Sequence, residues 1–132
     1  MEEELRARLV AAVETLVPAG QIVWSQRVGP VLPAIVLHRI TGRPDYTMRG
    51  PSGLMDSIVQ IDCWGSSAMS VLTVSRAVKA ALSAWGGGLI SRVFVENERS
   101  SFEQAEGANG AVEPSEFHRV SLDFRVWHHD AN

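Results

Sequence analysis

The chain has 132 residues, of which 45% are hydrophobic and 20% charged, and its formal net charge at pH 7 is −3. This composition is typical of a globular protein and excludes disordered and fibrous classes, so we expect a single domain over residues 1–132. The negative charge argues against a nucleic-acid-binding surface, and the lack of an apolar run of about 18 residues argues against a membrane span.

The N-terminal third predicts one helix and two strands. Residues 2–17 are expected to be helical, because apolar residues recur at helical spacing: Leu5, Leu9, Ala12, Val13 and Leu16. A short strand over residues 22–28 and a stronger one over residues 34–41 (AIVLHRIT) follow, separated by a turn at residues 29–33.

Residues 42–53 are predicted to be a loop of about a dozen residues, rich in Gly and Pro, with Tyr46 near its centre. Such a loop is long for a hairpin connection, which indicates a functional role. A strand over residues 54–64 should follow, with Val59, Ile61 and Cys63 facing one way and Ile58, Gln60, Asp62 and Trp64 the other.

The C-terminal half predicts a second helix and two further strands. The helix should begin at a Ser66 or Ser67 cap and run to about Trp85, with the apolar stripe Val71, Val74, Val78, Ala81, Leu82 and Trp85, before the glycines at 86–88. Strands are expected over residues 89–99 and around Val120 to Val126, with an acidic loop over residues 100–116 between them. The order α-β-β-β-α-β-β predicts an α+β fold, a mainly antiparallel sheet packed against two helices.

No residue pattern predicts enzyme chemistry. Cys63, the only cysteine, lies mid-strand among apolar residues, which is typical of a packing role and favours a reducing compartment. His128 and His129 should point to opposite faces of a strand, so we interpret them as a fraying polar C-terminus and not as a metal site. We therefore expect no catalytic residue, no metal and no cofactor.

Two surfaces are better candidates for binding. Met69, Leu72 and Arg76 follow one another at helical spacing beside the core stripe, where they could widen the core contact or form a subunit contact. Trp127 falls on the polar face of the last strand beside Arg125, where it could be covered by a loop or could anchor a partner.

Five segments together carry a resemblance to a known family: PAIVLH (33–38), DYT (45–47), GPSGL (50–54), VQIDCWG (59–65) and SLDFRVWH (121–128). Their order and spacing resemble the tail-completion, or tail-terminator, proteins of long-tailed phages, and most closely those of alphaproteobacterial prophages and gene transfer agents. The resemblance covers nearly the whole chain, and the acidic loop at residues 100–116 contributes least to it.

The resemblance implies a homohexameric ring that caps the tail tube, ends its polymerisation and docks onto the head-side connector. DNA would pass through its lumen without specific binding. The protein would be cytoplasmic during assembly and then part of the particle at the head–tail junction. On this basis Arg43, Tyr46 and Arg49 become candidates for contact with a neighbouring subunit or the tube, together with Met69, Leu72, Arg76 and Trp127.

Two alternatives remain open at this stage. Another head–tail joining protein of the same particle, such as the head-side stopper, would also be a small α+β ring component. A more distant possibility is a small ligand-binding domain or enzyme, which would require a concave pocket with convergent polar groups.

Overall fold

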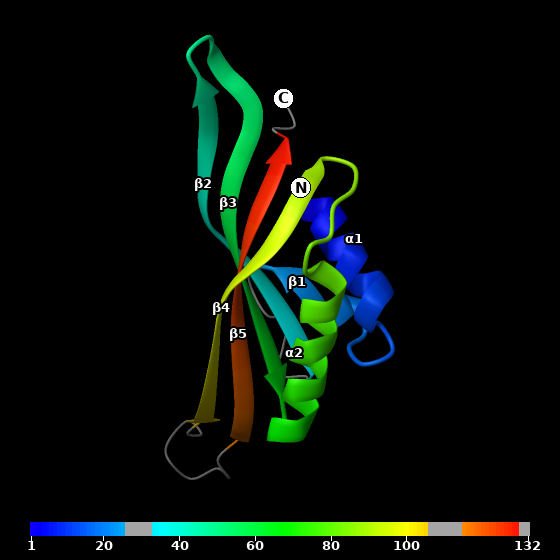
Figure 1. Ribbon diagram of the computed structural model, residues 1–132. Helices are drawn as coiled ribbons and strands as arrows, with labels where there is room; N and C mark the ends of the chain where they lie inside the picture. Colours follow the sequence, from blue (N-terminus) through cyan, green and yellow to red (C-terminus); the bar gives the residue numbers. More distant parts are fainter. Residues whose placement is uncertain (26–32, 106–114, 130–132) are drawn as a thin grey trace.

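The computed structural model describes residues 1–25, 33–105 and 115–129, and its centre is a five-stranded sheet in the order β1-β2-β3-β5-β4 (Figure 1). The elements are α1 (Glu2–Val13), a 3₁₀ turn (Ala19–Gln21), β1 (Ile22–Trp24), β2 (Ala34–Thr47), β3 (Gly50–Gly65), α2 (Ala68–Leu82), β4 (Ile90–Ala105) and β5 (Ser115–His129). The strand β1 pairs with β2 in parallel, and every other pairing is antiparallel. The predicted α+β class and element order are thereby confirmed.

Both helices cover the same face of the sheet, and the apolar core lies between them and the strands (Figure 1). The predicted alternation in the two central strands is confirmed. The side chains of Val59, Ile61 and Cys63 on β3 are completely buried in this core, as are those of Leu122, Phe124 and Val126 on β5. Burial of a large apolar side chain contributes about 1.5–3 kcal/mol relative to exposure, so this face dominates the stability of the fold.

The first helix is shorter than predicted, and its predicted stripe is confirmed at Leu5, Leu9 and Val13 but not at Ala12 and Leu16. It ends at Val13, and the chain then turns so that the amide of Val17 donates to the Val13 carbonyl at 2.8 Å. The buried residues recur every four positions: Met1, Leu5, Leu9, Val13 and Val17. The expected contributions of Ala12 and Leu16 are therefore wrong, because both side chains are exposed.

The second helix begins where the sequence predicts, with the Ser67 side chain accepting a hydrogen bond from the Ser70 amide at 3.1 Å. Its predicted stripe is buried from Val71 to Leu82, and Trp85 packs half-buried against the core. The helix ends at Leu82, three residues before the predicted end. The reason is competition from β4, since the Ala84 amide and the Trp85 carbonyl both bond to Val93.

Both predicted long loops are wrong in their described parts, because strands extend through them. Residues 42–53 complete the hairpin of β2 and β3, and residues 100–105 and 115–116 belong to β4 and β5. Residues 106–114 of the predicted acidic loop lie outside the described residues. So do residues 26–32, which include the predicted end of the strand over 22–28 and most of the turn at 29–33.

The two hairpins extend beyond the helices at opposite ends of the sheet (Figure 1). We call residues 42–53 the β2–β3 arm, because β5 pairs with β3 only from Leu54 onward. We call residues 103–105 and 115–117 the β4–β5 arm, because β3 ends opposite His118. Within residues 1–25, 33–105 and 115–129, neither helix has the length and apolarity needed to cross a bilayer.

Candidate functional site

The β2–β3 arm ends in a tight turn formed by Met48 and Arg49. The Thr47 hydroxyl donates to the Gly50 carbonyl and accepts from the Arg49 amide, both at 3.2 Å. Gly50 has a φ of 120°, a backbone conformation that residues with a β-carbon rarely adopt. The tip is thus a built turn and not an irregular loop.

The side chains of this arm are free for contact. Tyr46 is 66% exposed and Met48 is fully exposed at the tip. Arg43 and Arg49 are exposed, and neither guanidinium group forms an ion pair within the described residues. The arm's acidic residue, Asp45, instead accepts a hydrogen bond from Ser52 at 2.8 Å. The structure therefore brings the predicted Arg43, Tyr46 and Arg49 together on one arm.

Met48 is a residue that the sequence reasoning missed. Its position between two predicted candidates, in the centre of a Gly/Pro-rich segment, was the only signal for it. An uncharged, flexible side chain with no contacts of its own at a hairpin tip is suited to insertion into an apolar surface.

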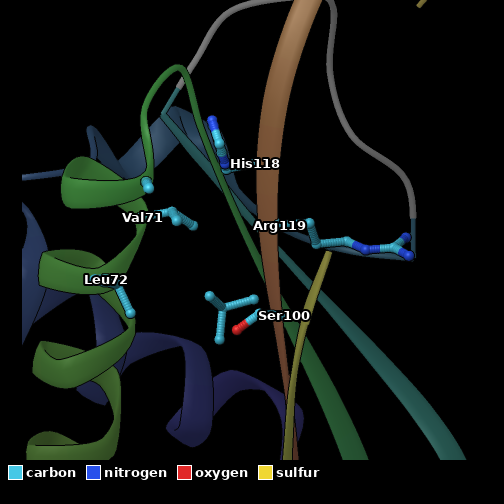
Figure 2. A pocket seen from close by; sticks show the side chains of 7 residues that line it. Val71, Leu72, Ser100, His118 and Arg119 are labelled. Atoms are coloured by element: carbon cyan, nitrogen blue, oxygen red, sulfur yellow. The ribbon is translucent and has the colours of Figure 1, made fainter. Parts of the chain in front are cut away.

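A groove of about 360 Å³ lies at the other end of the molecule, between the start of α2 and the β4–β5 hairpin (Figure 2). We call it the α2 groove. Its apolar walls come from Val71 and Leu72 on the helix and from Val120 on β5, and its lining also includes Ala68, Ser100, His118 and Arg119. The Arg119 side chain runs away from the helix, and its guanidinium group lies 5.0 Å from the centroid of the Trp64 ring (Figure 2).

The predicted surface of the second helix only partly overlaps this groove, since Leu72 is the one predicted residue that lines it. Leu72 is half-buried in its wall, and Met69, one residue after the lining residue Ala68, is 73% exposed. Arg76 is exposed one turn further along the helix, outside the groove lining. On the same helix Lys79 pairs with Glu98 of β4 at 3.0 Å, which ties the helix to the strand.

Trp127 lies on the sheet face opposite the helices, where it is half-buried and not fully exposed. Its neighbour Arg125 bonds to Asp56 and, at 2.6 Å, to Glu96. Arg43 stands directly opposite Asp56 in the β2–β3 register and lines a small hollow with Asp56 and Arg125. Trp127 is therefore separated from the α2 groove by the thickness of the sheet.

Cys63 does not have the environment of a nucleophile. Its side chain is completely buried on the core face, and that burial, with the charges of Asp62 and Glu98, raises the pKa of its thiol to about 12. Since the thiolate is the reactive form, this residue stays an inert thiol at neutral pH.

Ser57 and His128 form a buried pair at the upper end of the core. The His128 Nδ1 lies 3.2 Å from the His129 carbonyl oxygen, which can only accept, so the Nε2 accepts from the Ser57 hydroxyl at 2.7 Å. Ser57 is completely buried and His128 is 3% exposed, so no substrate can reach them. The prediction of a fraying C-terminus is wrong for residues 128 and 129, because β5 continues to His129.

Comparison with known proteins gives matches to a family model and to solved structures. The family model described as tail completion protein gp17 matches residues 3–129 of the chain. A chain of the solved structure "Virion of native gene transfer agent (GTA) particle" is similar with a TM-score of 0.64 and 15% sequence identity, over 96% of this chain and 92% of that chain. At 15% identity this second match shows that the two chains share a fold, and nothing more. No curated protein sequence matches the chain.

Proposed function

The chain belongs to the tail completion protein gp17 family, and we propose from this premise that it is a structural protein of tail assembly that forms a ring on the tail tube. The ring has six copies, ends polymerisation of the tube and joins the tail to the head-side connector. It works without catalysis, metal or cofactor. The protein assembles in the cytoplasm and remains in the particle at the head–tail junction.

The observation that supports this proposal is a pair of unlike surfaces at opposite ends of the molecule, both of which are candidates for subunit contact. One is the β2–β3 arm, with exposed Tyr46 and Met48. The other is the α2 groove, which lies where α2 begins, at the end of the sheet opposite to the arm. Figure 1 shows the arm and the start of α2 at these opposite ends. A head-to-tail contact between unlike surfaces forms a ring when its rotation closes. A chain with one such pair of surfaces has what ring formation requires.

The proposed partners are the tail tube protein on one side of the ring and the head-side connector on the other. Arg76 and Trp127 lie outside the groove lining, so they are candidates for these contacts and not for closure of the ring. DNA passes through the lumen, and the net charge of −3 suits a channel that does not hold a polyanion.

The test is electron microscopy of particles produced in cells that lack this protein. Overlong tails that fail to join heads are the expected result, and the intact gene supplied in trans should restore normal particles. Tails of normal length with unjoined, leaking heads would favour the head-side stopper role. Normal particles would contradict both assignments.

A further inference from the structure

We propose that the tip of the β2–β3 arm of one copy inserts into the α2 groove of the next copy, with Met48 entering the groove and Arg43 and Arg49 facing the acidic β4–β5 arm. This contact would be the one that closes the ring. The inference rests on the proposed function for its biological setting, but it concerns a contact that can be tested on the isolated chain.

The apolar parts of the two surfaces match in chemistry. Met48 is fully exposed at the tip of the arm, so its whole side chain is available for contact. The groove has about 360 Å³ of open space, and its apolar lining is the half-buried Leu72 with the nearly buried Val71 and Val120. Methionine side chains are enriched in subunit interfaces and adapt to irregular hollows.

The charges of the two arms are opposite. In the β2–β3 arm Arg43 and Arg49 are unpaired within the described residues, and Asp45 is held by Ser52. The chain from residue 101 to 117 contains four glutamates and no lysine or arginine. Two of these, Glu103 and Glu116, belong to the paired strands of the β4–β5 arm. Complementary charge of this kind steers two surfaces together and fixes their register.

The placement of the surfaces favours a second copy as the occupant. The start of α2 and the β4–β5 arm lie at one end of the sheet, and the β2–β3 arm projects from the other end (Figure 1). An arm therefore lies far from the groove of its own chain. The groove of a neighbouring copy can receive it in a head-to-tail arrangement.

Cysteine cross-linking of the full chain tests the contact directly. The chain carries Met48→Cys and Leu72→Cys, with Cys63→Ala to remove the native thiol, and is oxidised at high protein concentration and again on isolated tube ends. We expect disulfide-linked multimers that require both new cysteines in the same chain. Equal multimer yields from the chain with Met48→Cys alone, or no cross-links under either condition, would overturn the proposal.

Charge exchange supplies the specificity test in the same cross-linking assay. Arg43→Glu with Arg49→Glu makes both arms acidic, and Glu103→Arg with Glu116→Arg makes both arms basic. Each variant alone should lose at least about tenfold in cross-linking yield, because like charges then face each other. An equimolar mixture should recover most of the yield, because every contact between unlike copies again joins opposite charges.

Mixing would not restore the cross-linking yield of a misfolded variant. The mixture therefore distinguishes a variant that has lost the contact from one that has lost its fold. Glu14→Arg is the matched control, since it makes the same change at an exposed position away from both arms. Unchanged yields for both charge variants would overturn the proposed contact and leave the tail function untouched. Open chains of many cross-linked copies on tube ends, in place of closed rings, would instead contradict the ring and preserve the contact.

Discussion

At the scale of single residues, the chemistry-bearing side chains of the core stabilise the fold. Cys63 packs among Val59, Ile61 and the helices as a small apolar group. His128 and Ser57 form a hydrogen bond with each other where the sheet meets the start of α1. Substitution of these buried residues should therefore change the stability of the fold and not a chemical activity.

Replacement of Cys63 by alanine and by serine should show separately how side-chain volume and polarity at this site affect the free energy of unfolding. Cys63→Ala should cost on the order of 1 kcal/mol of unfolding free energy through the small cavity it leaves. Cys63→Ser should cost about 1–3 kcal/mol more, because it buries a hydroxyl in an apolar site. Urea denaturation of the three proteins measures both differences. A serine variant as stable as the alanine variant would show that the site is more polar than its burial indicates.

His128 should make the fold sensitive to mild acid. Burial lowers the pKa of its imidazole from the ordinary 6.5, and the charges of Arg39 and the chain's amino terminus lower it further. The His129 carbonyl and Glu2 act in the opposite direction. Because the unfolded chain then binds the proton more readily, stability falls as pH drops below about 6.5 and levels off below the lowered pKa of the folded state.

The variant His128→Gln tests this effect, because glutamine keeps a polar partner for Ser57 but does not titrate. Its free energy of unfolding should change less between pH 7.5 and 5 than that of the parent, by roughly 1 kcal/mol for each pKa unit of the shift that it removes. His129→Gln is the matched control, since His129 is exposed. Equal pH dependence in the parent and the His128 variant would sink the assignment.

At the scale of elements, a local signal fixes the start of α2, while tertiary pairing fixes its end. Ser67 caps the helix through its own hydroxyl, which is a property of the local sequence. The opposite end is set by Val93 of β4, a residue that local sequence cannot report.

Ser67→Ala should lower the unfolding free energy by about 1 kcal/mol, the usual effect of losing an N-cap hydrogen bond. Ser66→Ala, its neighbour in the same exposed turn, should change stability by only a few tenths of a kcal/mol. Thermal and urea denaturation of both variants give the comparison. An equal loss of unfolding free energy in both variants would contradict the assignment of Ser67 as the N-cap residue.

The same distinction explains what sequence could and could not predict. Strict alternation at Val59–Cys63 and Val120–Val126 correctly predicts the central strands, because one face is buried. Pro44, Gly50, Pro51 and Gly53 make residues 42–53 resemble a loop. In the structure these residues lie where the hairpin has lost its outer neighbours. Proline and glycine are tolerated there because few inter-strand hydrogen bonds are required.

The candidate surfaces were predictable only in part for a related reason. Helical spacing correctly groups Met69 with Leu72, because both belong to one helix. The groove itself depends on Ser100 and Val120, which are far away in sequence and reach it only through the pairing of β4 with β5.

At the scale of the whole molecule, the sheet separates the two proposed contact surfaces. The β2–β3 arm projects from one end of the sheet, and the α2 groove lies where α2 begins, at the other end (Figure 1). The arm therefore cannot reach the groove of its own chain. Assembly is then the way in which both can be covered.

The double variant Tyr46→Ala with Arg49→Ala should fold normally but fail in assembly. Both side chains are exposed and support no core contact, so the melting temperature should stay within about 2 °C of the parent. Particles made with this variant should be tailless or headless under the electron microscope. Glu14→Ala with Thr15→Ala, two exposed residues after α1, should give normal particles. Normal particles from the first pair would rule out its role.

Sedimentation should detect a change in oligomeric state that depends on the tube. The isolated protein is expected to sediment as a monomer at micromolar concentration, since one arm-and-groove contact is small compared with stable interfaces of roughly 1,200–2,000 Å². Addition of assembled tail tube should recruit it as rings at the tube ends. Binding of single copies along the whole tube would contradict ring formation.

The central strands have a mechanical consequence. Strands β3 and β5 pair from Leu54 with His129 to Gly65 with His118 without a bulge, whereas the outer strands β2 and β4 are interrupted. The unbroken ladder connects the roots of the two arms, and the buried face behind it is packed at low compressibility. A pull on one arm would load these hydrogen bonds in shear, all at once, and reach the other arm with little stretch. An assembly built from such subunits would therefore transmit force between neighbouring copies as a stiff link.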